Sequence, residues 1–146
     1  MWQQQVSILL LWATGRDLFG QLGDGSTDSR VTFTRVVENS AKAVSAGHLH
    51  SMILLQDGSV WATGMNNFGQ LGFGTTISWT RFVQVISGGV RAVAAGDWHS
   101  MILKDDGSLW ATGANSYGQL GGWFPANDNK FVKYTRVHLT CIEHGT

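Results

Sequence analysis

The sequence contains one cysteine, Cys141, and one proline among its 146 residues. A lone cysteine excludes an internal disulfide and a cysteine-based zinc site within one chain, and it favours a reducing, intracellular compartment, either cytoplasmic or nuclear. Because proline is almost absent while glycine occurs 19 times, we expect the turns to be built mainly from glycine. Frequent turns combined with only 14% charged residues favour short strands over long amphipathic helices.

The chain also lacks an excess of charge of either sign. Ten Lys and Arg balance ten Asp and Glu, so the sequence does not show the basic footprint typical of a nucleic-acid-binding protein. Near the N-terminus, the apolar run Val6–Trp12 is too short to span a bilayer, and no Lys or Arg precedes it as in a secretory signal. We therefore predict a strand for this run and expect neither a nucleic acid nor a membrane as partner.

What the sequence does contain is an internal repeat. Its three copies read LWATGRDLFGQLG at 11–23, VWATGMNNFGQLG at 60–72 and LWATGANSYGQLG at 109–121. The tryptophans of these copies, Trp12, Trp61 and Trp110, are spaced by 49 residues (61 − 12 and 110 − 61). A period near fifty residues is typical of propellers and repeat arrays, so each copy is expected to be one structural unit.

Each complete unit carries four strand signals. The expected strands are 34–37, 43–46, 50–55, 60–63, 81–86, 90–94, 99–104 and 109–112. Two pairs of these runs are joined by an Asp-Gly pair, Asp57-Gly58 and Asp106-Gly107. An Asp-Gly pair between two apolar runs predicts a β-hairpin with a type I′ turn, which has positive φ at both central residues.

Four short strands per fifty residues are typical of a propeller blade. We predict an all-β fold, a β-propeller fragment of two to three four-stranded antiparallel blades, open rather than closed, as a single domain over residues 1–146. The repeat units are approximately 11–59, 60–108 and a partial 109–146, and residues 1–10 are the degenerate end of a preceding unit. We expect either a fragment of a longer array or a locally damaged copy, with open blade edges that permit self-association.

The third unit is expected to carry an insertion. When Thr135-Arg136 is aligned with Thr80-Arg81, the segment 122–134 (GWFPANDNKFVKY) lies outside the common pattern. Loops that depart from a repeat tend to carry function. The candidate partner-binding residues are therefore Trp123, Phe124, Asp128 and Lys130, together with Arg16, Asn66 and Asn115, where the three copies differ. The alternative is that the aromatic residues fold back and cover the edge of a terminal blade.

Residues that recur with the period are expected to build the scaffold. They are Trp12, Trp61 and Trp110 for packing between blades, His50 and His99 for bonding a turn, and Gly69, Gly72, Gly118 and Gly121 for the turns themselves. His48 and His50 form an H-x-H pair, but no third metal ligand is in view. The glycine loops open no helix, so they do not predict a phosphate site. We expect no catalytic residue, cofactor or metal.

Three motifs in fixed order identify a family resemblance. The combination of AGHLHS and AGDWHS, beginning at Ala46 and Ala95, with DGSVWATG and NNFGQLG resembles the regulator of chromosome condensation repeat. The resemblance implies a seven-bladed β-propeller, of which this chain would hold two repeats and part of a third. Proline is usual in that family where Arg35, Arg81 and Arg136 stand here; these arginines are expected to pair with carboxylates or to form a basic ladder on one rim.

The resemblance leaves the function open among several classes. Members of the family serve as protein-interaction modules, which makes a non-catalytic scaffold that binds protein partners the preferred expectation. The alternative implied by the family's namesake is guanine-nucleotide exchange on a small GTPase, although no element matching its exchange loops is found in this sequence. A third alternative is a truncated gene product without an independent role. A shared fold does not by itself transfer function.

Overall fold

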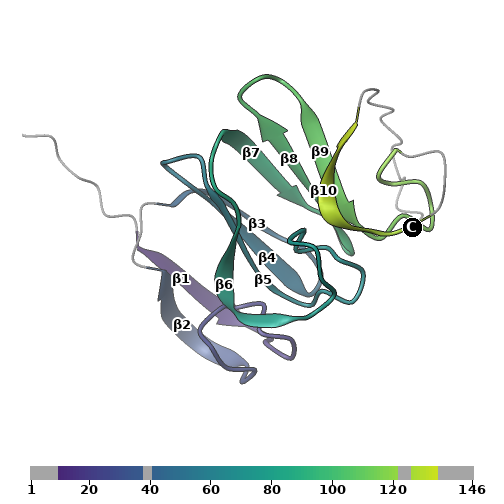
Figure 1. The fold of residues 1–146 in the computed structure, drawn as a ribbon. Helices are drawn as coiled ribbons and strands as arrows, with labels where there is room; N and C mark the ends of the chain where they lie inside the picture. Colours follow the sequence, from purple (N-terminus) through teal and green to yellow (C-terminus); the bar gives the residue numbers. More distant parts are fainter. Residues whose placement is uncertain (1–9, 38–40, 122–125, 135–146) are drawn as a thin grey trace, which may run out of the picture.

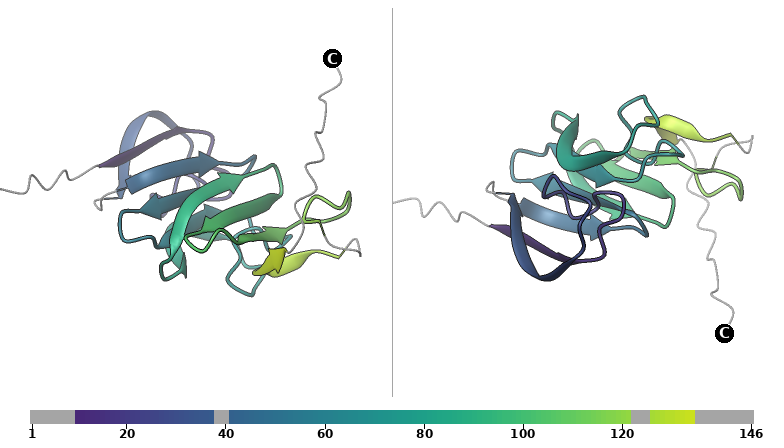
Figure 2. Two further views of the ribbon diagram at one scale, coloured as in Figure 1. Left: turned by 90° about the horizontal axis from the view of Figure 1, so that it is seen from above. Right: turned by 90° about the horizontal axis from the view of Figure 1, so that it is seen from below.

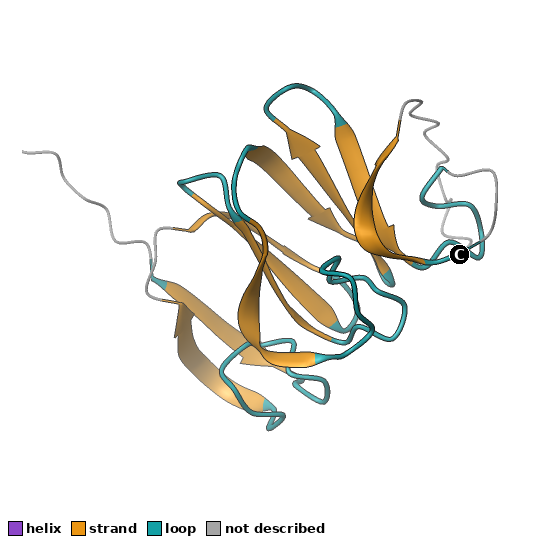
Figure 3. Ribbon diagram, viewed as in Figure 1, coloured by secondary structure: helices purple, strands orange, loops and turns teal. Residues whose placement is uncertain are grey.

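The computed structural model describes residues 10–37, 41–121 and 126–134, and within these ranges it contains strands and no helix (Figures 1 and 3). The strands are β1 (Leu11–Gly15), β2 (Arg30–Val37), β3 (Ala41–Ala46), β4 (His50–Leu55), β5 (Val60–Gly64), β6 (Trp79–Ile86), β7 (Val90–Ala95), β8 (His99–Lys104), β9 (Leu109–Gly113) and β10 (Asp128–Tyr134). No helix in the described ranges is long and apolar enough to cross a membrane.

The strands form three antiparallel sheets. Two sheets have four strands each, in the orders β3-β4-β5-β6 and β10-β9-β8-β7, and the third consists of β1 and β2 alone. They stand side by side along an open arc, with the β1–β2 sheet at one end and the β7–β10 sheet at the other (Figures 1 and 2). This confirms the predicted all-β, four-stranded, open blade architecture. We call the sheets blade 1 (β1–β2), blade 2 (β3–β6) and blade 3 (β7–β10).

The hairpins form where the sequence predicts them, but their turns differ in type. Gly58 has φ of +80°, whereas no residue other than glycine has positive φ in the described ranges. The amide of Gly58 donates to the carbonyl of Leu55 (3.0 Å), and the amide of Ser59 donates to the Asp57 carboxylate (2.9 Å). This is a type I turn followed by a left-handed glycine, the usual geometry of a longer hairpin loop, and not the predicted type I′ turn.

The expected insertion at 122–134 is wrong, because β10 begins where the period of 49 places it. A threonine hydroxyl fixes this start in every blade. Thr14, Thr63 and Thr112 each donate to the carbonyl 16 residues later, on Arg30, Trp79 and Asp128, at 2.9, 2.9 and 2.7 Å. The Thr-Arg pairs used for the sequence alignment are therefore not equivalent. By the period, Arg81 corresponds to Lys130 and not to Arg136, which lies outside the described residues.

The core lies between blades 2 and 3. It consists of the buried side chains Met52, Leu54, Val60, Ala62, Leu71, Val90, Ile102 and Phe131. Leu54, Val60, Ala62 and Leu71 have no exposed surface. The first strands of the two blades, β3 and β7, are joined by the amide of Ala95, which donates to Ser45 Oγ (2.9 Å). Apolar side chains of both blades thus share one buried cluster, and its burial stabilises the two sheets against each other.

Candidate protein-interaction surface

Adjacent blades are joined by contacts that occur twice in the chain. Thr63 of blade 2 donates to the carbonyl of Gly20 in blade 1, and Thr112 of blade 3 donates to the carbonyl of Gly69 in blade 2, both at 2.8 Å. The single proton of each hydroxyl is thus shared between two carbonyls, one in its own blade and one in the preceding blade. We call this recurring contact, with the packing described next, the blade junction.

The glycines of the GQLG loops accept side chains of the next blade. A Cβ at Gly23 would overlap the ring of Phe82, and a Cβ at Gly72 would overlap the ring of Phe131. Both glycines also have positive φ, +77° and +82°, so their place in a turn and their role at the junction both require glycine. Gly69, Gly118 and Gly121, also predicted as turn residues, have positive φ as well.

His50 lies in the junction between blades 2 and 3. Its Nε2 is 2.9 Å from Ser100 Oγ, which donates to the carbonyl of Gln70 at 2.7 Å. Since the serine proton is used on that carbonyl, His50 donates from Nε2 and is neutral. Burial, followed by the nearby His99, lowers the pKa of His50 to about 4. His50 thus has a structural role, as expected, but its partner is a serine side chain of the next blade and not the backbone of a turn.

Two predicted partner-binding residues are buried and serve the loop fold instead. Asn66 has no exposed surface; its Oδ1 accepts from the amide of Leu71 (2.9 Å), and its Nδ2 donates to the carbonyls of Thr75 (2.9 Å) and Ile77 (3.1 Å). Asn115 is 2% exposed and accepts from the amide of Leu120 (2.9 Å). The two asparagines stand at the same position of the repeat and fix the interior of their loops in the same way.

The remaining candidates are dispersed. Arg16 and Lys130 are exposed, and the Lys130 side chain crosses Gly74 of the preceding blade. Asp128 accepts from the Tyr134 hydroxyl (3.1 Å); burial and then this carboxylate raise the pKa of Tyr134 to about 12. Trp123 and Phe124 lie outside the described residues. The described residues include no group of three or more His, Cys, Asp or Glu side chains placed to hold a metal ion.

The repeated tryptophans are not equally packed, which corrects the prediction that all three are core residues. Trp12 is 50% exposed because β1 is an edge strand in the described structure, whereas β5 and β9 have a partner on both sides. Trp61 and Trp110 are half-buried, and their indole N–H groups donate to Ser59 Oγ (3.1 Å) and Ser108 Oγ (2.8 Å).

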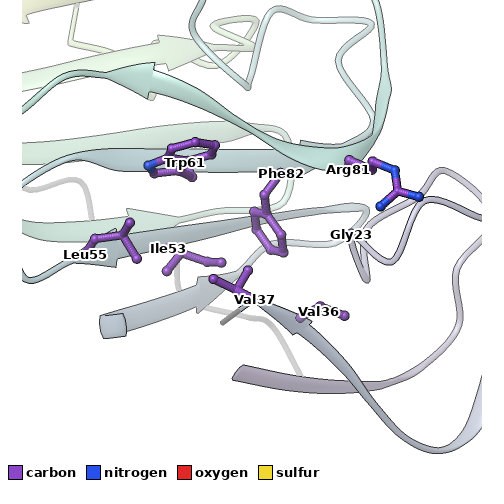
Figure 4. Close-up of a pocket in the computed structure, with 8 residues that line it drawn as sticks. All are labelled: Gly23, Val36, Val37, Ile53, Leu55, Trp61, Arg81 and Phe82. Carbon is purple, nitrogen blue, oxygen red and sulfur yellow. The ribbon is translucent and has the colours of Figure 1, made fainter. Parts of the chain in front are cut away.

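Two cavities lie between blades 1 and 2. One, of about 260 Å³, is lined by valines of β2, by Ile53, Leu55, Trp61 and Phe82, and by the Arg81 side chain (Figure 4). The other, of about 300 Å³, is more apolar; its lining includes Trp12, Phe33, Val44 and Met52. Trp12 and Val44 are 50% and 58% exposed. We call this second cavity, between β1–β2 and β3–β4, the inner cleft.

Comparisons with known proteins agree with this geometry. Two models of the regulator of chromosome condensation (RCC1) repeat match the sequence, one at residues 41–70 and 90–119 and the other at 57–103. No curated protein matches the sequence significantly.

Solved structures match the fold at low sequence identity. Yeast RCC1 (Prp20), in its complex with Kap60, is 20% identical, with a TM-score of 0.72 over 85% of this chain and 32% of the other. Prp20p of Saccharomyces cerevisiae is 20% identical, with a TM-score of 0.73 over 85% and 33%. Human WBSCR16 is 23% identical, with a TM-score of 0.72 over 84% and 34%. The chain thus spans about a third of the length of these proteins.

Proposed function

Since the chain belongs to the family of regulator of chromosome condensation (RCC1) repeats, we propose that it is a protein-binding scaffold and not an enzyme. The observation that carries the proposal is that its buried polar side chains form structural hydrogen bonds. His50, Ser100 and Asn66, which in other settings would supply catalytic or ligand groups, are buried and spent on holding blades and loops together. What the surface offers instead is apolar: the inner cleft and exposed aromatic side chains beside it.

The inner cleft is the part of this surface that we assign to a partner. Val44 on β3 is 58% exposed, whereas the equivalent Val93 on β7 packs against the core. Together with the half-exposed ring of Trp12 it gives the cleft an apolar opening. A cavity of 300 Å³ is at the lower end of the volumes found for ligand pockets, so it suits one or two apolar side chains of a protein partner.

A matched pair of substitutions tests this assignment. Val44→Asp places a charge in the inner cleft, and Ile77→Asp places the same charge on an exposed loop of blade 2, where Ile77 is 64% exposed. Proteins retained by the immobilised wild-type chain should be lost from the first variant, by at least about tenfold in affinity, and kept by the second. Equal retention by all three chains would exclude the inner cleft as the binding site.

Guanine-nucleotide exchange is the second candidate, and the fold comparison is what favours it. The matched Prp20p structure is described together with binding to Gsp1p and histones, which suggests a small GTPase or a histone as a class of partner for this chain too. A nucleotide-release assay over a panel of small GTPases tests the point. The scaffold proposal expects binding without acceleration of release; acceleration by catalytic amounts of the chain would replace it with exchange activity.

A further inference from the structure

The two ends of the arc carry the two complementary halves of a blade junction. One half consists of the outer strand of a blade and the strand paired with it, whose phenylalanine and threonine reach the preceding blade; in blade 1 these residues are Phe33 on β2 and Thr14 on β1, with Val31 on β2 beside Phe33. We call these three residues the donor face. The other half is the GQLG loop that receives them, which in blade 3 spans Ala114–Gly121. We call this loop the acceptor loop.

Among the described residues, no preceding blade covers the donor face. Phe131, at the equivalent position of blade 3, is 8% exposed against the glycine that receives it, whereas Phe33 is 69% exposed. Val31 is 99% exposed. Thr63 and Thr112 are buried, each bonded to two carbonyls, while Thr14 is exposed and bonds only the carbonyl of Arg30. The threonine of a blade is therefore buried, and its phenylalanine buried or half-buried, where a preceding blade is present, and both are exposed where it is not.

The acceptor loop is unpaired in the same way. At Gly20 and Gly69, a Cβ would overlap the backbone of the next blade, at Thr80 and Asn129, and both glycines are buried. A Cβ at the equivalent Gly118 meets nothing within 4 Å.

The two glycines of this loop that correspond to the covered glycines of the internal junctions are exposed to solvent. Gly118 and Gly121 are exposed, although they keep the positive φ, +73° and +75°, of their buried equivalents. The acceptor loop thus has the same backbone conformation as the loops at the two internal junctions, but no outer strand of a following blade covers it in the described residues.

We propose that the donor face of one copy packs on the acceptor loop of a second copy, forming a head-to-tail junction. The Phe33 ring lies on Gly121 of the second copy, and the Thr14 hydroxyl bonds the carbonyl of its Gly118. The occupant is fixed by the two junctions already in the chain, which show this same chemistry on this same loop. Since the two halves are different surfaces, the contact is heterologous, and each added copy leaves one donor face and one acceptor loop free.

Sedimentation of the purified chain over a range of concentrations tests the junction. The wild type should associate progressively, and Phe33→Asp should weaken association by at least about tenfold, because it puts a charge on the central aromatic anchor. Gly118→Ala should weaken it similarly, since a Cβ there would meet the incoming strand as it would at Gly20.

The control for backbone strain is Gly107→Ala, whose φ is +83° with open space around it. This variant should associate as the wild type does. If it instead loses association as Gly118→Ala does, strain and not the junction is responsible, and the inference is overturned.

Mixing the variants gives the decisive result. Phe33→Asp keeps its acceptor loop and Gly118→Ala keeps its donor face, so a mixture should form a one-to-one pair although neither variant self-associates. A wild-type chain that stays monomeric, variants that associate like the wild type, or a mixture that does not pair would each overturn the junction. Phe33 and Thr14 also line the inner cleft, so the variant that separates the two proposals is Gly118→Ala, which changes the acceptor loop and leaves the lining of the inner cleft unaltered.

Discussion

Asp17 stands where blades 2 and 3 have an asparagine, and its environment suits an asparagine better. Its Oδ1 accepts from the amide of Leu22 (2.8 Å), as the side-chain oxygens of Asn66 and Asn115 do in their own loops. Its Oδ2 is buried without a partner. By the period of 49, the carbonyls that Asn66 reaches with its amide nitrogen correspond to those of Ser26 and Asp28. At this position the other two loops have an amide N–H donor, whereas the Asp17 carboxylate has only acceptor oxygens to set against these carbonyls.

Asp17→Asn should therefore stabilise the protein at neutral pH. The change supplies a donor for the two backbone carbonyls and removes a buried carboxylate oxygen, Oδ2, that has no hydrogen-bond partner. Two hydrogen bonds of about 1 kcal/mol each give a gain of about 2 kcal/mol in the free energy of unfolding. For a chain of this length, such a gain raises the melting temperature by roughly 6 °C.

The gain should depend on pH in a defined direction. Burial, and after it the charge of Asp24, raises the pKa of Asp17 above 3.8, although the Leu22 amide opposes this. A carboxyl whose pKa is raised on folding is favoured in its protonated form, so the wild type loses stability as the pH rises from about 3.8 to the folded pKa. The advantage of Asp17→Asn should thus be small in acid and should reach its full value above that window.

Calorimetry of both proteins between pH 3 and 8 measures this difference directly. The reverse change, Asn66→Asp, is the matched control and should lower the melting temperature at neutral pH while recovering in part in acid. If Asp17→Asn is neutral or destabilising at pH 7, or if its advantage grows as the pH falls, the account of position 17 is wrong.

Two further predictions concern the blade junctions. Gly72→Ala should lower the free energy of unfolding by more than Gly107→Ala. Both variants force an alanine into a left-handed conformation, at a cost of about 1–2 kcal/mol, but only the Cβ at position 72 also overlaps the Phe131 ring. Urea denaturation of the two variants measures the difference. Because burial lowers the pKa of His50 from 6.5 to about 4, the wild type should lose up to roughly 3 kcal/mol as the pH falls through that interval, and His50→Gln should remove this part of the pH dependence of unfolding. A pH profile unchanged by His50→Gln would contradict the buried, neutral state of this ring.

The central strands were predictable because each is enclosed by its own signals. β4 and β8 begin and end where expected, between an Ala-Gly segment and an Asp-Gly turn. The turn type was not predictable in the same way, since an Asp-Gly pair serves both a two-residue turn and a longer loop that ends in a left-handed glycine. The structure distinguishes the two by the pairing register, in which Leu54 is opposite Val60, and by the φ angles of the turn.

The outer strand was misplaced because its copies share little sequence. Arg30–Val37, Trp79–Ile86 and Asp128–Tyr134 have one residue type in common at equivalent positions, the phenylalanine at 33, 82 and 131. That signal was present at the period of 49, but the Thr-Arg pairs competed with it and gave a false insertion. Asn66 and Asn115 were misassigned for a different reason: an asparagine looks the same in sequence whether its amide bonds solvent or buried carbonyls.

The proposed head-to-tail junction uses residues that the copies share, whereas the sequence led us to expect function where the copies differ. Among residues that differ, Asn66 and Asn115 are buried. Among residues that are the same, threonine at 14, 63 and 112 and phenylalanine at 33, 82 and 131, the members in blade 1 are the exposed ones. A repeat builds each blade with both halves of a junction, and in the described residues the halves at the two ends of the arc are the exposed ones. In the proposed head-to-tail junction the scaffold residues themselves form the binding surface, and the two junctions within the chain specify the partner that fits it.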